Sequence, residues 1–96
     1  MAVLRLTRFT ADPDNTEELL AKRAALIAAV RDAFPGLTEA RLAKLDDGTW
    51  LDVWRWDSTA SMRAALESAP TIPDAAAAFA LTSDTTVETA EVVDER

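Results

Sequence analysis

The residues with the clearest chemical potential lie in the run Trp50-Leu51-Asp52-Val53-Trp54-Arg55-Trp56, which reads as a strand. Successive side chains of a strand point to opposite faces, so the even positions place three tryptophans and one aspartate on one side. Indole rings offer flat apolar surfaces on which a planar aromatic molecule can stack. A carboxylate among them is a candidate acceptor for a phenolic proton. This face is therefore the first candidate for a binding or catalytic site.

A second β-prone run, AVLRLTRFT at residues 2–10, adds two polar side chains to the same candidate site. Alternation puts Arg5 and Thr7 on one of its faces, together with Val3 and Phe9. If the two runs are adjacent strands of one sheet, the candidate site consists of Arg5, Thr7, Asp52, Trp54 and Trp56.

Two interpretations of this set remain open. An ionised Asp52 beneath helices is costly alone, and a nearby Arg5 would offset that cost, so we expect these two side chains to form an ion pair. In the structural interpretation, the tryptophans are core residues and the ion pair only supports the fold. In the functional interpretation, an aromatic ligand stacks on Trp54 or Trp56 and Asp52 takes its proton. A carboxylate desolvated among indoles would be a good base, whereas one held by arginine would be a poor base.

The elements that must position these residues follow from breakers and periodicity. The sequence predicts the order β-α-β-β-α-β, with elements at 2–10, 15–34, 38–45, 49–56, 59–67 and 85–93. Asp46-Asp47-Gly48 indicates a tight hairpin between the two middle strands. Pro73 suits the first turn of a further short helix that runs through an alanine segment to Phe79. We expect Met62, Ala65 and Leu66 to be the buried positions of the helix at 59–67.

This order predicts an α+β fold of the ferredoxin-like type, a four-stranded antiparallel sheet with its helices on one face. Residues 1–96 are expected to form a single domain. The sheet face away from the helices would carry the aliphatic residues Leu4, Leu6, Leu51 and Val53. Because a large exposed apolar patch is unfavourable in a monomer, we expect a second copy to cover it, giving a two-fold homodimer.

Composition excludes several classes of function. The net charge of −7 argues against nucleic acid and against anionic membrane surfaces as partners. The 96 residues contain no cysteine and no histidine, and we therefore expect no disulfide framework and no metal site. No apolar stretch approaches the length needed to span a bilayer, and the N-terminal run carries two arginines, unlike a signal peptide, so a cytoplasmic location is expected.

The other charged residues are expected to be solvated. Glu17, Glu18, Lys22 and Arg23 are assigned to an exposed helix face with weak i,i+4 pairs. The C-terminal acids Glu91, Asp94 and Glu95 are assigned to solubility.

Several short motifs together resemble the antibiotic biosynthesis monooxygenase family of dimeric α/β barrels. They occur in the order that the family shows, over nearly the whole chain: Arg8-Phe9, Phe34-Pro35-Gly36, Asp47-Gly48-Thr49-Trp50 and Trp56-Asp57-Ser58. The family includes cofactor-free oxygenases of polyketide quinol precursors, haem-degrading enzymes and members without known activity. The resemblance implies a homodimer and a possible small aromatic ligand.

The resemblance also implies site residues. In the quinol oxygenases an asparagine, a tryptophan and a tyrosine line the site, and their positions here hold Asp52, Trp56 and Met62. Asp52 and Trp56 are therefore the catalytic candidates, and Arg5, Thr7, Trp54 and Met62 are the substrate-binding candidates. In the haem-degrading branch the corresponding asparagine and tryptophan fall on Thr7 and Ala65, and its histidine ligand has no counterpart. Haem degradation is disfavoured, and no cofactor is expected.

Two functions remain open at this point. The first is a cofactor-independent monooxygenase that acts on a small aromatic or polyketide-like substrate. The second is a non-catalytic homodimeric module that binds a small hydrophobic ligand, or a member of the family with a degenerate site.

Overall fold

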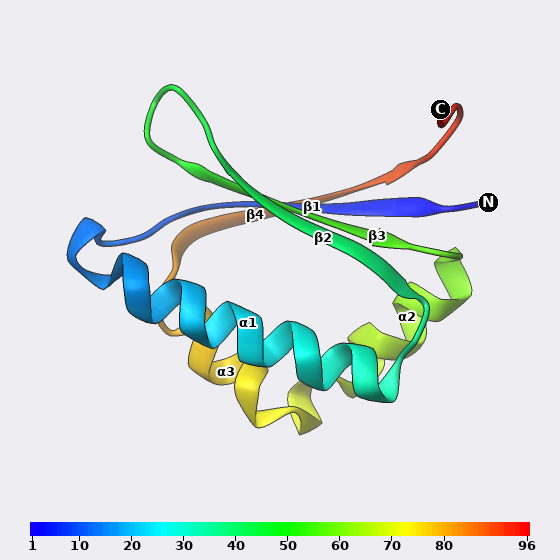
Figure 1. The fold of residues 1–96 in the computed structure, drawn as a ribbon, viewed down its shortest axis with the longest axis horizontal. Helices are drawn as coiled ribbons and strands as arrows, with labels where there is room; N and C mark the ends of the chain where they lie inside the picture. Colours follow the sequence, from blue (N-terminus) through cyan, green and yellow to red (C-terminus); the bar gives the residue numbers. More distant parts are fainter.

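The computed structural model describes all residues, 1–96, and has one four-stranded sheet. Its strands are β1 (Val3–Thr10), β2 (Leu37–Lys44), β3 (Trp50–Trp56) and β4 (Ser83–Glu91), in the spatial order β2-β3-β1-β4. Every neighbouring pair is antiparallel. The predicted ferredoxin-like α+β fold is confirmed, with the first and third strands side by side in the centre (Figure 1).

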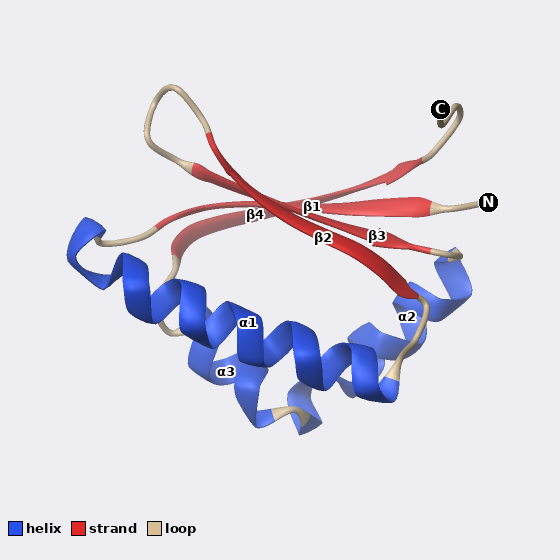
Figure 2. Ribbon diagram, in the orientation of Figure 1, coloured by secondary structure: helices blue, strands red, loops and turns tan.

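All helices lie on one face of this sheet, and the other face is bare (Figure 2). The helical elements are α1 (Thr16–Ala33), α2 (Thr59–Ser68) and α3 (Pro73–Phe79), with single 3-10 turns at Pro13–Asn15 and Ala69–Thr71. Ser58 caps α2, because its Oγ accepts a hydrogen bond from the backbone N–H of Ser61 at 3.1 Å. None of these helices is both long and apolar enough to cross a membrane.

The core lies between the sheet and the helices. It consists of nine buried residues: Val3, Leu26, Val30, Leu37, Trp56, Met62, Ala65, Ala75 and Ala78. Three of them are alanines from α2 and α3, which lets these helices pack closely. Met62 and Ala65 are buried as predicted, whereas Leu66 is exposed and that prediction was wrong.

The register of the two central strands fixes which side chains share a face. Arg5 is directly opposite Trp54, and Thr7 is directly opposite Asp52. Because both members of such a pair point to the same side of the sheet, the predicted inner face is confirmed. β4 begins two residues earlier than expected, at Ser83, and all nine of its residues are exposed.

The bare outer face carries an ion pair that the sequence did not suggest. Arg55 of β3 donates to both carboxylate oxygens of Glu95, each at 2.6 Å, and to Thr38 Oγ1 at 2.7 Å. These hydrogen bonds raise the pKa of the Arg55 guanidinium and lower the pKa of the Glu95 carboxyl. The assignment of Glu95 to a free solubilising tail was therefore wrong, since the C-terminal residues fold back to the outer face.

A close backbone approach joins the end of β3 to the start of β2. The backbone N–H of Asp57 donates to the carbonyl of Gly36 at 2.9 Å. A Cβ added at Gly36 would lie 2.7 Å from Ser61 Cβ and 2.8 Å from Asp57 Oδ1. Glycine is required here because α2 begins against this backbone.

We predict that Gly36→Ala lowers the free energy of unfolding by about 1–3 kcal/mol, as expected for overpacking at a buried site. Urea denaturation followed by tryptophan fluorescence measures the change. Gly48→Ala is the contrasting variant, because no atom lies within 4 Å of a Cβ there and only its φ of +89° opposes the side chain. A Gly36→Ala protein as stable as the parent would show that α2 can shift away at little cost.

Candidate functional site

A cavity of about 160 Å³ lies between the inner face of the sheet and the three helices. Of its 20 lining residues, 14 are hydrophobic, so it suits a mainly apolar ligand. The six polar ones are Arg5, Thr7, Arg23, Asp52, Thr82 and Thr85. Leu66, Phe79 and Val87 line the cavity and are also exposed, which shows that it opens to solvent. Its volume is similar to that of a cavity that accepts roughly one benzene ring, so a larger ring system would extend through the open side.

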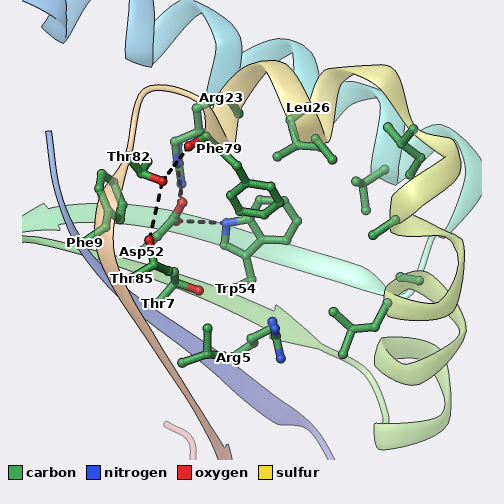
Figure 3. A pocket seen from close by; sticks show the side chains of 18 of the residues that line it. Arg5, Thr7, Phe9, Arg23, Leu26, Asp52, Trp54, Phe79, Thr82 and Thr85 are labelled. Atoms are coloured by element: carbon green, nitrogen blue, oxygen red, sulfur yellow. Dashed lines mark hydrogen bonds and ion pairs between the residues drawn. The ribbon is translucent and has the colours of Figure 1, made fainter.

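The polar centre of the cavity is a bidentate ion pair between α1 and β3. Arg23 Nε donates to Asp52 Oδ2 at 3.0 Å, and Arg23 Nη2 donates to Asp52 Oδ1 at 2.9 Å (Figure 3). The two side chains are only 17% and 14% exposed. Trp54 Nε1 donates a further hydrogen bond to Asp52 Oδ1, at 2.9 Å. Both carboxylate oxygens are thus occupied by donors from the protein.

This ion pair corrects two sequence-based expectations. Asp52 pairs with Arg23 and not with Arg5, and Arg23 is not part of a solvated helix face. The physical reason is the register, since Thr7 and not Arg5 lies directly opposite Asp52. Arg23 belongs to the face of α1 that also presents Leu19 and Leu26 to the cavity. Arg23 lies four residues after Leu19 and three residues before Leu26, and this helical spacing was the signal that could have placed it on the same face.

Arg5 lines the same cavity without a protein acceptor. It is partly buried, and its guanidinium takes part in no side-chain hydrogen bond and no ion pair. Figure 3 shows it apart from the Arg23–Asp52 pair. Burial lowers the pKa of the Arg5 guanidinium from its ordinary value, because the charged form loses solvation without gaining a counter-ion.

Two of the three tryptophans line the cavity. The rings of Trp54 and Trp56 are 6.5 Å apart between centroids and are tilted by 40°. Trp56 is 2% exposed, and its Nε1 is buried without a hydrogen-bond partner. Trp50 instead stacks on Phe9, with centroids 6.5 Å apart, and Lys44 Nζ lies 4.9 Å from the centre of its ring. Among the tryptophans, the aromatic surface available to a ligand therefore comes from Trp54 and Trp56, and Phe9 and Phe79 add two further rings to the lining.

Threonines form the remaining polar edge of the cavity. Thr82 Oγ1 donates to the carbonyl of Phe79 at 2.9 Å and lies 3.5 Å from Thr85 Oγ1 (Figure 3). Thr82 lies between α3 and β4, and Thr85 belongs to β4. Sequence reasoning missed both because threonines in a polar segment give no distinctive pattern. Thr7 comes from β1, as predicted.

The structure brings together five of the six site residues inferred from the sequence: Arg5, Thr7, Asp52, Trp54 and Trp56. Met62 is not among the residues that line the cavity, since it is 5% exposed and belongs to the buried core. No three acidic side chains gather in the way that metal ligands would.

The fold and site can be compared with known proteins. SnoaB, a cofactor-independent oxygenase from Streptomyces nogalater, superposes with a TM-score of 0.78 in a crystal structure of one variant. The two chains are 22% identical over 98% of this chain and 95% of SnoaB. Rv0793 from Mycobacterium tuberculosis has a TM-score of 0.68 and 27% identity, covering 99% and 98% of the two chains.

A third similar structure is a variant of MhuD with two manganese protoporphyrin IX molecules bound per active site, with a TM-score of 0.69 and 20% identity. It covers 98% of this chain and 97% of MhuD. No curated protein sequence matches the chain. The family model for antibiotic biosynthesis monooxygenases matches residues 2–81, so this chain, with its helix-covered tryptophan cavity, belongs to the antibiotic biosynthesis monooxygenase family.

Proposed function

We propose that the protein is a cofactor-independent monooxygenase of a small electron-rich aromatic or polyketide-like molecule. The observation that carries the proposal is the apolar cavity walled by Trp54 and Trp56, with Arg5 and Thr7 as polar groups beside them. The similarity to SnoaB, which is a cofactor-independent oxygenase, supports the same activity.

Anthrone illustrates the reaction class. Its methylene carbon loses two hydrogens and gains one oxygen atom from dioxygen to become a carbonyl, and the second oxygen atom leaves as water. The substrate supplies all the electrons once it has been deprotonated, so the tasks of the protein are to bind the ring, stabilise the anion and exclude water. Trp54 and Trp56 would bind the ring, and the apolar helices would limit access of water.

Asp52 is less suited to act as the base than its position alone suggests. Its oxygens already accept three hydrogen bonds, two from Arg23 and one from Trp54. A proton acceptor must present a free lone pair to the substrate, and of the roughly four acceptor positions of a carboxylate only one, on Oδ2, is left. We propose that Asp52 positions the indole of Trp54 and the guanidinium of Arg23, while the bound substrate loses its proton to water at the open side of the cavity.

The second candidate function is a non-catalytic module that binds a small hydrophobic ligand. The commitment of Asp52 to Arg23 is the observation that favours it, because the cavity then offers a binding surface without an evident base. Both functions use the same cavity and the same tryptophans.

We further propose that two copies pair through the bare face of the sheet. Leu4, Leu6, Leu51 and Val53 occupy the centre of that face and are only partly buried in the single chain. Figure 1 shows no helix on this side. A two-fold pairing would remove this aliphatic surface from water.

The activity is tested by oxygen consumption with anthrone and with hydroquinone, measured with an oxygen electrode. We expect turnover by the parent protein and about a tenfold lower kcat/KM for Trp54→Leu, because the variant loses the ring that stacks on the substrate. Trp50→Leu is the matched control, since Trp50 lies outside the cavity, and its kcat/KM should stay within about twofold.

Absence of turnover with ligand-induced quenching of tryptophan fluorescence would favour the binding module. Absence of both turnover and quenching would contradict both functions of the cavity.

The role of Asp52 is tested by a double-mutant cycle with Arg23→Met and Asp52→Asn. Arg23→Met should lower the free energy of unfolding by about 2–4 kcal/mol, since it leaves a buried carboxylate without its counter-ion. The double variant should recover part of this loss, and urea denaturation gives the coupling energy. If Asp52 were the catalytic base, Asp52→Asn would instead lower kcat by roughly 100-fold or more.

The interface is tested by light scattering at micromolar concentration. The parent should have the mass of a dimer, and Leu6→Asp should have the mass of a monomer, because a carboxylate cannot be buried in an aliphatic interface at acceptable cost. Leu20→Asp is the control, since Leu20 is exposed on α1, away from the outer face of the sheet. A dimeric Leu6→Asp protein would place the interface elsewhere.

A further inference from the structure

The charges that line the cavity do not balance. Arg5, Arg23 and Asp52 are its charged residues, and Arg23 neutralises Asp52. One positive charge, that of Arg5, is left over in a mainly apolar space. A cation removed from water without a partner is unfavourable, and a bound anion would offset that cost.

The hydrogen-bond donors of the cavity are also in excess. The indole N–H of Trp54 and two N–H groups of Arg23 are satisfied by Asp52. The Arg5 guanidinium and the indole N–H of Trp56 have no acceptor, and the latter is fully buried. Trp56 Nε1 lies too deep for a ligand to reach, whereas Arg5 is only partly buried and lines the cavity. The N–H groups of Arg5 are therefore the free donors that a ligand in the cavity would meet.

We infer that the cavity binds its aromatic ligand as an oxyanion, with a ring carboxylate or phenolate oxygen accepting hydrogen bonds from the guanidinium of Arg5. The inference rests on the proposed function only in taking the ligand to be aromatic. Guanidinium N–H groups form a fork that matches two oxygen acceptors, and such charge-assisted bonds are about twice as strong as neutral ones.

This assignment has a chemical consequence for the proposed reaction. A phenol reacts with dioxygen as its phenolate, because only the deprotonated ring is a ready electron donor. Arg5 would stabilise this form directly, so that the phenol loses its proton more easily in the cavity than in water. Arg5 would then take over the task that the sequence pattern had assigned to Asp52.

The test compares benzoate with benzamide, which have similar shape but differ in charge at neutral pH. Binding is followed by the three indole N–H signals in ¹H–¹⁵N NMR spectra of the intact protein. We expect benzoate to bind at least about tenfold more tightly than benzamide, because only benzoate places a charge beside Arg5. The Trp54 and Trp56 signals should move, and the Trp50 signal should not.

Variants at Arg5 assign the preference to this side chain. Arg5→Gln should abolish it, and Arg5→Lys should keep part of it, which excludes general damage to the fold. Arg63→Met is the matched control, because Arg63 is exposed on α2 and does not line the cavity, and its preference should equal that of the parent. Equal binding of benzoate and benzamide to the parent, or an unchanged preference in Arg5→Gln, would overturn the inference.

A spectroscopic measurement extends the test to phenols. The phenolate of 4-nitrophenol absorbs in the visible range and its phenol does not, so absorbance reports the pKa of the bound molecule. We expect the parent to lower this pKa and Arg5→Gln to leave it near its value in water. No change in the parent would contradict phenolate stabilisation. Because neither measurement requires oxygen, a failure of the proposed oxygenation would leave this result intact.

Discussion

The arrangement of the inner face depends on the ion pair between Arg23 and Asp52. A carboxylate in a central strand beneath helices needs a counter-ion, and the helix that crosses it supplies one. The pair links α1 to β3 directly. It also fixes Trp54, because the same carboxylate accepts the indole N–H. One electrostatic requirement thus sets the position of a helix and the orientation of an aromatic wall, and it leaves Arg5 as the free cation of the cavity.

The two faces of the sheet are specialised in different ways. The inner face combines indole rings with Asp52, which is paired with Arg23, and with the unpaired Arg5. The outer face has an aliphatic centre with charged residues at its margin, where Arg55 holds the C-terminal Glu95. Because side chains alternate along each strand, neighbouring residues of β1 and β3 lie on different faces of the sheet. A side chain that is substituted on one face therefore makes no direct contact with the other face of the sheet.

The fold and most of the candidate site could be predicted from the sequence. Alternation in two short runs was sufficient to place Arg5, Thr7, Asp52, Trp54 and Trp56 on one face, because strand periodicity does not depend on the neighbouring elements. The ion-pair partner could not be predicted in the same way. It depends on the strand register and on the side of α1 that faces the sheet. Arg23 was assigned to an exposed helix face, although it lies on the side of α1 that also carries Leu19 and Leu26.

The misassigned Met62 has a related cause. The family resemblance gave it a site role from its position in the chain, but it is packed in the buried core and is not among the residues that line the cavity. Thr82 and Thr85 were missed for another reason, because they reach the cavity only through the packing of α3 and β4 against the other elements. Periodicity therefore predicts which face of an element a residue occupies, and the packing of elements decides which residues meet.

The part of the cavity wall formed by α2, α3 and the turn between them contains four alanines, Ala65, Ala69, Ala75 and Ala78. Each of these side chains is a single methyl group, so the small volume of these residues leaves space for a ligand. The charged groups of the cavity come from other elements, β1, β3 and α1. Evolution could therefore resize the chamber by exchanging small side chains on α3, and so change which ring systems enter, while the charged groups stay in place. Because different walls set the size and the polarity of the cavity, this fold is well suited to evolve toward different members of a group of related small molecules.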